Sequence, residues 1–254
     1  MSKEQEIAKC LLEKRDNKEF WFGIEKRLKG ETNKKTEYNR FFFIAIMDRQ
    51  MKAEKVVINA DNLINNYLYN SENLHNSENL WAAIRNTNRE TWNKWWKKGK
   101  FHRFRNRVCD EQYENADIMK CYDDDARKIW EGCKNASELK KRLQRFRGVG
   151  LAITNMIIGG LFDLKQIDPK QIDPKEMDVK PDVHVRRVLG RVFTGKEFTR
   201  EKAAEKAGQM HPENPWKLDR SIFTLGRNYC HAKKPKCEDC YLKTHCKYYR
   251  QNDL

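Results

Sequence analysis

Four cysteines near the C-terminus have the type and spacing that a metal centre needs. Cys230, Cys237, Cys240 and Cys246 follow the pattern C-x6-C-x2-C-x5-C. Four soft thiolates can hold either a tetrahedral zinc ion or a [4Fe–4S] cluster. Zinc ribbons usually carry two C-x2-C pairs, whereas this segment has one such pair and two wider arms, so the spacing favours iron–sulfur over zinc. The arms surround the predicted centre with positive charge from Lys233, Lys234, Lys236, Lys243 and Lys247.

A second candidate for chemistry is the carboxylate of Asp182. It follows Pro181 and precedes an apolar run with helical spacing, which is typical of a helix N-cap. A capping carboxylate can also face a cleft, so the structural and the chemical role are compatible. His184 lies one helical step further along, and we interpret it as structural.

A third candidate is the turn Phe146-Arg147-Gly148-Val149-Gly150, which lies between two helical patterns at residues 137–146 and 151–162. Two glycines around one apolar residue permit a tight turn with backbone N–H groups facing outward. The N-terminus of the following helix adds a positive dipole end. Together these features predict a seat for a phosphate group.

The charge of the chain fits such a seat. The 254 residues include 52 Lys and Arg against 37 Asp and Glu, so the formal charge is 52 − 37 = +15. This favours a polyanionic partner, although a merely solubilising basic surface is the plain alternative. No apolar run reaches the roughly 18 residues of a membrane span, and the opening residues lack a secretory h-region. We therefore expect an intracellular protein with reduced thiols and no membrane partner. The pattern gives no role beyond that of small buried side chains to Cys10, Cys109, Cys121 and Cys133.

The elements that must position these residues are mostly helices. Apolar periodicity predicts helices over residues 5–12, 38–57, 61–68, 78–85, 89–96, 101–109, 123–133, 137–146 and 151–162, and no Asn-Gly or Asp-Gly hairpin occurs. Two short tandem repeats, NSENL within residues 70–81 and QIDPK over 166–175, are interpreted as insertions in surface loops. Trp92, Trp95 and Trp96 have helical spacing, which favours core packing over stacking on a base.

Taken in chain order, these motifs resemble one family. Gly148-Val149-Gly150, the segment DVHVRRV at residues 182–188, LGRNYC at 225–230 and the cysteine spacing look like the endonuclease III branch of the helix-hairpin-helix DNA glycosylases. The resemblance implies an all-α, two-lobed fold. One lobe, residues 37–163, would be a six-helix barrel with the hairpin. Residues 1–36 and 178–254 would form the iron–sulfur cluster lobe, with 164–177 as the linker.

The resemblance also implies an activity and its residues. The partner would be double-stranded DNA with a damaged, mismatched or modified base, bound by a monomer that flips the base out and cuts its glycosidic bond. Asp182 would be the catalytic carboxylate, Gln50 would fill the space of the extruded base, and Gly148, Val149 and Gly150 would grip the DNA backbone. The cysteines Cys230, Cys237, Cys240 and Cys246 would hold a structural [4Fe–4S] cluster.

One departure from the family pattern bears on the mechanism. Bifunctional members place a lysine two residues after the second hairpin glycine, where it forms a Schiff base with the sugar. Here that position is Ala152, and residues 151–162 contain no lysine. The chain therefore resembles the monofunctional members, in which the aspartate and a water molecule cleave the bond.

Three alternatives stay open at this point. Strand cleavage could use an amine of the linker, at Lys165, Lys170, Lys175 or Lys180. The chain could be a non-catalytic protein specific for DNA damage or structure, or an iron–sulfur redox sensor. The excised base is equally open among mismatched thymine or uracil, alkylated bases and modified cytosines. Adenine opposite oxidised guanine is disfavoured, because members of that kind usually add a further C-terminal domain.

Overall fold

The computed structural model describes residues 2–14, 34–69 and 79–252, and within these ranges the chain is helical with no strand. This confirms the predicted all-α fold. The α-helices are α1 (Lys3–Glu13), α3 (Lys34–Met47), α4 (Ala53–Leu63), α5 (Leu80–Asn86), α6 (Arg89–Gly99), α7 (Arg105–Ile118), α8 (Arg127–Trp130), α9 (Ala136–Leu143), α10 (Leu151–Asp163), α11 (Val183–Thr194), α12 (Arg200–Met210), α13 (Asp219–Asn228) and α14 (Lys247–Gln251). A π-helical turn (Ile64–Leu68) extends α4, and short 3₁₀ turns lie at Met119–Tyr122, Pro174–Glu176, Pro215–Leu218 and Lys243–His245.

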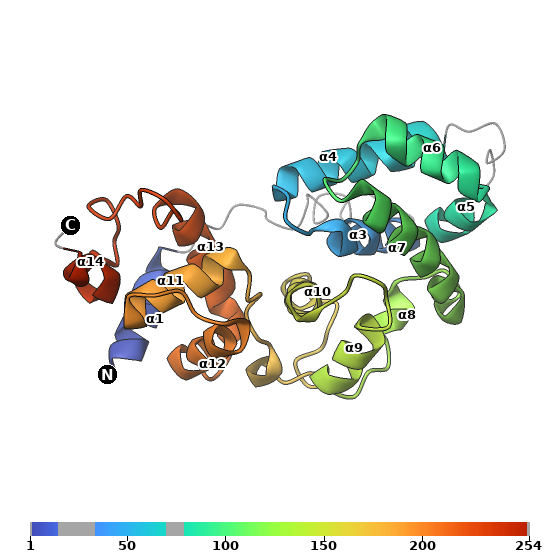
Figure 1. Ribbon diagram of the computed structural model, residues 1–254. Helices are drawn as coiled ribbons and strands as arrows, with labels where there is room; N and C mark the ends of the chain where they lie inside the picture. Colours follow the sequence, from blue (N-terminus) through green and yellow to red (C-terminus); the bar gives the residue numbers. More distant parts are fainter. Residues whose placement is uncertain (1, 15–33, 70–78, 253–254) are drawn as a thin grey trace. The chain divides into compact units, whose positions relative to one another are not determined.

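Helices α3 to α9 lie in one compact unit, which spans Glu19–Ile157. At its centre is α3, whose residues from Phe41 to Met47 are all buried. A helix that is apolar on every side must be enclosed, and α3 packs against α4, α5 and α8 (Figure 1). The Phe42 ring lies 4.8 Å from that of Phe146, so the residue that opens the predicted hairpin is anchored in this core.

The second compact unit comprises Met1–Lys18 and Ile158–Leu254. Here α11 packs against α12, α13 and α14, and α1 packs against α12 and α13 (Figure 1). Their apolar faces form one core that includes Leu11, Val188, Ala207 and Ile222. This unit contains both Asp182 and the cysteine-rich segment.

The two units divide inside α10, between Ile157 and Ile158, whereas the resemblance implied a linker at residues 164–177. The reason lies in how the end of α10 packs. A Cβ atom added to Gly159 would lie 2.1 Å from the Trp216 ring, so the glycine allows close contact between this part of α10 and the second unit. The indole N–H of Trp216 also donates to Asp163 at 3.1 Å.

The QIDPK repeat is more than a pair of surface insertions. Ile167 and Ile172, at equivalent places in the two copies, are both buried. In each copy the aspartate accepts a hydrogen bond from the backbone N–H two residues later, Asp168 from Lys170 at 2.8 Å and Asp173 from Lys175 at 2.9 Å. The repeat thus builds the same turn twice. The other repeat, at residues 70–81, lies mostly outside the described residues.

The predicted helix over residues 38–57 is interrupted. The structure ends α3 at Met47 and begins α4 at Ala53, and Gln50 between them has a left-handed φ of 53°. The carbonyl oxygen of Arg49 forms a hydrogen bond with the Nε2 atom of His102 at 3.0 Å, although the two residues are 53 positions apart in the sequence. Tertiary contacts therefore override a local pattern that carries neither glycine nor proline. None of the described helices is long and apolar enough to cross a bilayer.

Candidate functional site

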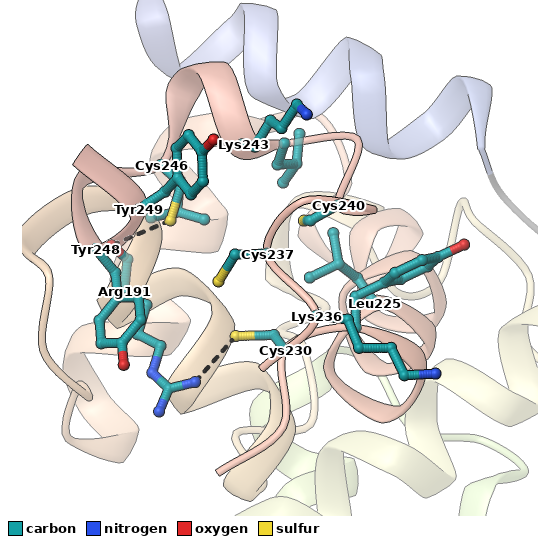
Figure 2. A pocket seen from close by; sticks show the side chains of 13 residues that line it. Arg191, Leu225, Cys230, Lys236, Cys237, Cys240, Lys243, Cys246, Tyr248 and Tyr249 are labelled. Atoms are coloured by element: carbon teal, nitrogen blue, oxygen red, sulfur yellow. Dashed lines mark hydrogen bonds between the residues drawn. The ribbon is translucent and has the colours of Figure 1, made fainter. Parts of the chain in front are cut away.

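The four C-terminal cysteines line one pocket between α11, α13 and α14. Figure 2 shows the sulfur atoms of Cys230, Cys237, Cys240 and Cys246 turned toward a common space. That space is about 360 Å³, part of it open to solvent, and its walls include Val192, Leu225 and Leu242. The loop between Cys230 and Cys246 thus folds around a small, largely apolar hollow that all four cysteines line.

Burial raises the pKa of three of these thiols, and the neighbouring cysteines add to the effect. The pKa of Cys240 rises to about 11, and those of Cys237 and Cys246 are also raised. Within the described residues, no group of three or more His, Cys, Asp or Glu side chains is arranged to hold a single metal ion. The four thiols nevertheless line one pocket.

Two arginines of α11 fasten this helix to the cysteine loop. The Arg187 Nε atom donates to the carbonyl oxygen of Cys230 at 2.7 Å. Arg191 donates to the Sγ atom of Cys230 at 3.5 Å and to the carbonyl oxygen of His231 at 2.7 Å, and its guanidinium lies 4.5 Å from the Tyr248 ring centroid (Figure 2). Because Asp182 caps the same helix, the carboxylate and the cysteine loop are both attached to α11.

Asp182 is the N-cap of α11, as predicted. Its Oδ1 atom accepts hydrogen bonds from the backbone N–H groups of His184 at 2.8 Å and Val185 at 3.0 Å. Among the described residues, no hydrogen bond engages its Oδ2 atom, and the side chain is half-buried. One oxygen thus fixes the carboxylate while the other is available to a ligand.

His184 has the structural role expected of it. Its Nδ1 atom lies 3.0 Å from Nη2 of Arg187, and its ring centroid lies 5.0 Å from that of Phe223. Burial lowers the pKa of His184, so the neutral imidazole accepts the arginine N–H. The histidine therefore supports α11 against α13.

The hairpin between α9 and α10 is held by a buried asparagine of α7. Asn115 accepts a hydrogen bond from the backbone N–H of Arg147 at 2.7 Å and donates one to its carbonyl oxygen at 3.2 Å. Gly148 follows with a φ of 78°, a conformation that favours glycine. Val149 is buried and donates its N–H to Phe146 at 3.2 Å, so its amide points into the turn rather than outward.

Gly150 differs from Gly148 in what surrounds it. A Cβ atom added to Gly148 would meet the Arg49 guanidinium at 2.2 Å, whereas one added to Gly150 would meet no atom within 4 Å. Gly150 is exposed, and no internal contact requires a glycine there. Ala152 follows in the first turn of α10 and is half-buried, and α10 contains no lysine.

Arg49 connects the hairpin to the segment that carries Gln50. It forms an ion pair with Glu111 of α7, whose carboxylate also binds Arg107 at 2.8 Å. Gln50 is exposed, and its carbonyl oxygen accepts a hydrogen bond from Arg103 at 3.2 Å. The structure thus places Gln50, the hairpin and Arg103 in one unit.

Comparisons with known proteins find similarity to the family that the motifs suggested. A stretch of 71 residues is 37% identical to endonuclease III of Thermotoga maritima, and one of 73 residues is 32% identical to that of Sulfolobus acidocaldarius. Each match covers 28% of this chain and 33% of the relative, so the chain spans about a third of the length of these relatives. No family model matches the chain.

Solved structures match over nearly all of the chain. A non-covalent endonuclease III–DNA complex superposes with a TM-score of 0.65 at 16% identity, covering 100% of this chain and 99% of that one. This chain has the endonuclease III fold. A thermostable thymine-DNA glycosylase matches with a TM-score of 0.64 at 17% identity, covering 98% of this chain and 97% of that one. The resemblance inferred from the motifs is confirmed.

Several residues of this endonuclease III-like chain could not be singled out from sequence. Asn115 and Glu111 act on segments more than 30 residues away, and no local pattern marks them. Arg187 and Arg191 do share a signal, because their i, i+4 spacing puts both on one face of α11. The tryptophans Trp92 and Trp96 are buried in the core, as their spacing predicted.

Proposed function

We propose that this endonuclease III-like chain is a monofunctional DNA glycosylase that removes a damaged, mismatched or modified base from double-stranded DNA. The observation that carries the proposal is the carboxylate of Asp182, fixed through Oδ1 by two backbone amides and open at Oδ2. The named relatives and structural neighbours, endonuclease III and a thymine-DNA glycosylase, support the same class of activity.

The chemistry follows from the target bond. A base inside the duplex must be flipped out before its N-glycosidic bond is accessible, at a cost of a few kcal/mol. As that bond breaks, positive charge develops on the deoxyribose. The Oδ2 atom of Asp182 can stabilise this charge or take a proton from the attacking water. The exposed Gln50, presented on a left-handed turn, would occupy the vacated space in the stack.

Ala152 supports hydrolysis without strand cleavage. A Schiff base requires an amine, and α10 has none. The linker lysines Lys165, Lys170 and Lys175 are exposed, so their ammonium groups stay hydrated and poorly nucleophilic. Lys180 is half-buried and two residues from Asp182, which makes it the strongest candidate amine for the alternative, bifunctional mechanism.

The hairpin supports DNA binding. The first N–H groups of α10 have no intrahelical partner, which makes its N-terminus attractive to an anion. Within the described residues the N–H groups of Gly148 and Gly150 also make no hydrogen bond. Val149 anchors the turn, so we assign the phosphate contacts chiefly to the two glycines.

We assign a [4Fe–4S] cluster to Cys230, Cys237, Cys240 and Cys246. The four thiols line one hollow with largely apolar walls, and their spacing, one C-x2-C pair with two wider arms, favours iron–sulfur over zinc. The cluster would be structural, holding the lysine-rich loop in shape and leaving the chemistry to Asp182.

The deciding experiment uses end-labelled duplexes, each with one candidate base, resolved with and without hot alkali. We expect strand breaks only after alkali, which would establish base excision without lyase activity and identify the base. Breaks without alkali that borohydride traps covalently would contradict the monofunctional mechanism, and loss of trapping in Lys180→Gln would then identify the amine. A chain that binds these duplexes and cuts none would instead be a non-catalytic binder.

The hairpin gives a second prediction, for Gly150→Ala. The added methyl would keep a phosphate from the backbone amides, and losing one hydrogen bond to a charged group lowers affinity roughly 10- to 100-fold. Stability should not fall, because the methyl meets no atom of the chain. Fluorescence anisotropy with duplex DNA at several salt concentrations measures the effect.

Gly208→Ala in α12 is the matched control, since its added Cβ also meets no atom within 4 Å. It should bind DNA like the wild type and gain about 0.5–1 kcal/mol in stability from the helical alanine. If both variants bind DNA with equal affinity, the hairpin does not contact the DNA.

A further inference from the structure

A second carboxyl group lies close to Asp182 and has no part in the mechanism above. Asp219 is the first residue of α13 and is only 5% exposed. Its Oδ1 atom accepts a hydrogen bond from the backbone N–H of Lys180 at 2.6 Å. The Lys180 carbonyl oxygen in turn accepts the backbone N–H of Asp182 at 2.7 Å. Asp219 therefore holds the turn that leads directly into the candidate catalytic residue.

The segment before Asp182 is also fixed further upstream. The backbone N–H of Trp216 donates to the carbonyl oxygen of Met177 at 3.0 Å, and its indole N–H donates to Asp163. Trp216 lies in the 3₁₀ turn that runs into α13. The extended stretch up to Asp182 is thus attached at two points to the segment that carries Asp219.

The charged groups facing Asp219 are Asp182, Asp163 and Lys180. Burial, followed by the negative charge of Asp182, raises the pKa of Asp219 to about 7, although the start of a helix ordinarily favours a carboxylate. Asp182 is in a different environment, half-exposed and accepting two backbone N–H groups. When two neighbouring carboxyls sit in such unequal surroundings, the proton resides on the buried one.

We propose that Asp219 is a positioning residue for Asp182, which holds the Lys180–Asp182 turn through its buried carboxyl group and is itself protonated. This inference rests on the proposed function, because only in a glycosylase would the charge beside Asp182 act on the sugar. A protonated Asp219 leaves a single negative charge at the place where the sugar would develop its positive charge.

The first test does not depend on activity. Carboxyl-carbon NMR of the full-length protein should show Asp219 titrating near neutral pH, and in Asp182→Asn its titration should move to lower pH because the neighbouring charge is gone. An Asp219 that titrates in the ordinary range of an aspartate, or that ignores Asp182→Asn, overturns the proposal.

Stability should report the same proton. Because the folded-state pKa of Asp219 lies above its ordinary value of 3.8, its neutral form favours folding fully below about pH 4. That contribution is lost as pH rises through about 7. Asp219→Asn cannot ionise, so its free energy of unfolding relative to the wild type should increase between these limits. A constant difference across this range contradicts the inference.

The second test measures single-turnover base excision. Asp219→Asn keeps an acceptor for the Lys180 N–H, so its rate at pH 6 should stay within a few-fold of the wild type. The wild-type rate should fall as Asp219 ionises and repels Asp182, and the Asn variant should lack this fall. Asp219→Leu removes the acceptor, and misplacing Asp182 by about 1 Å should cost roughly 100-fold in rate with DNA affinity retained.

Glu205→Gln, an exposed change from carboxylate to amide in α12 of the same unit, is the matched control and should match the wild type. A wild-type rate in Asp219→Leu overturns the positioning role. If Asp219→Leu does not fold, the Asn variant and the titration decide. If the wild-type protein excises no base, the proposed function has failed, and the titration still decides whether Asp219 carries the proton.

Discussion

Asp182→Asn is expected to slow single-turnover base excision by about 10²- to 10⁴-fold, the range that a positioned acid or base contributes. The amide cannot take a proton from water, and it carries no charge to offset that of the sugar. DNA affinity should be retained, because the hairpin and the basic loops are unchanged. Rates measured with excess enzyme, beside anisotropy on the same duplex, separate the two effects.

The fold should survive this substitution. Asn caps helices about as well as Asp, so the bonds to His184 and Val185 can persist. Asp182→Ala should lose the same activity and, in addition, about 1 kcal/mol of stability as the cap disappears. Comparing the two variants distinguishes the chemical role of the carboxylate from its structural one.

Asp173→Asn supplies the control. Asp173 also accepts a backbone N–H through Oδ1, from Lys175 at 2.9 Å, and it lies exposed in the same unit. Its replacement should leave the excision rate unchanged. An Asp182→Asn protein as fast as the Asp173→Asn control would exclude Asp182 from the chemistry.

Asp182 illustrates what could be predicted from sequence. An N-cap depends on its own residue and the next three, so proline, aspartate and an apolar run were sufficient to locate it. The cysteine pocket was predictable for the same reason, since 17 consecutive residues supply all four thiols. Local chemistry is readable where the partners are close along the chain.

The supports of the site could not be predicted in this way. Asn115 fixes the hairpin from 32 residues away, and Asp219 reaches Lys180 across 39. Each is a polar residue on a helix whose sequence does not distinguish it from a solvated one. Only the packing of the helices brings each residue to its partner. Burial then makes the hydrogen bond important for stability, because an unpaired buried polar group is costly.

The prediction of one continuous helix over residues 38–57 was wrong for a related reason. The apolar residues on both sides continue a helical pattern, yet the backbone turns at Gln50 into the left-handed region. Contacts of Arg49 with Glu111 and His102 stabilise that turn. The residue proposed to enter the DNA stack is therefore presented on a loop between two helices, where its side chain is exposed.

Cys237→Ser is expected to abolish binding of the proposed [4Fe–4S] cluster. With one ligand gone, the iron and inorganic sulfide of the purified protein should fall to background, and the visible absorbance should be lost. The hollow between α11, α13 and α14 would then be lined by apolar side chains with nothing to fill it. Because a bound centre stabilises only the folded state, the thermal midpoint should also fall.

DNA affinity should weaken in the same variant, since Lys236 and Lys243 lie on the walls of this pocket and would no longer be held in position. For every phosphate that the loop no longer binds, the slope of log affinity against log salt should decrease by about 0.9. Cys121→Ser, at an exposed cysteine in the other unit, should change none of these properties. Zinc instead of iron in the wild-type protein would contradict the assignment of a cluster. An unchanged salt slope in Cys237→Ser would show that the loop does not contribute to DNA binding.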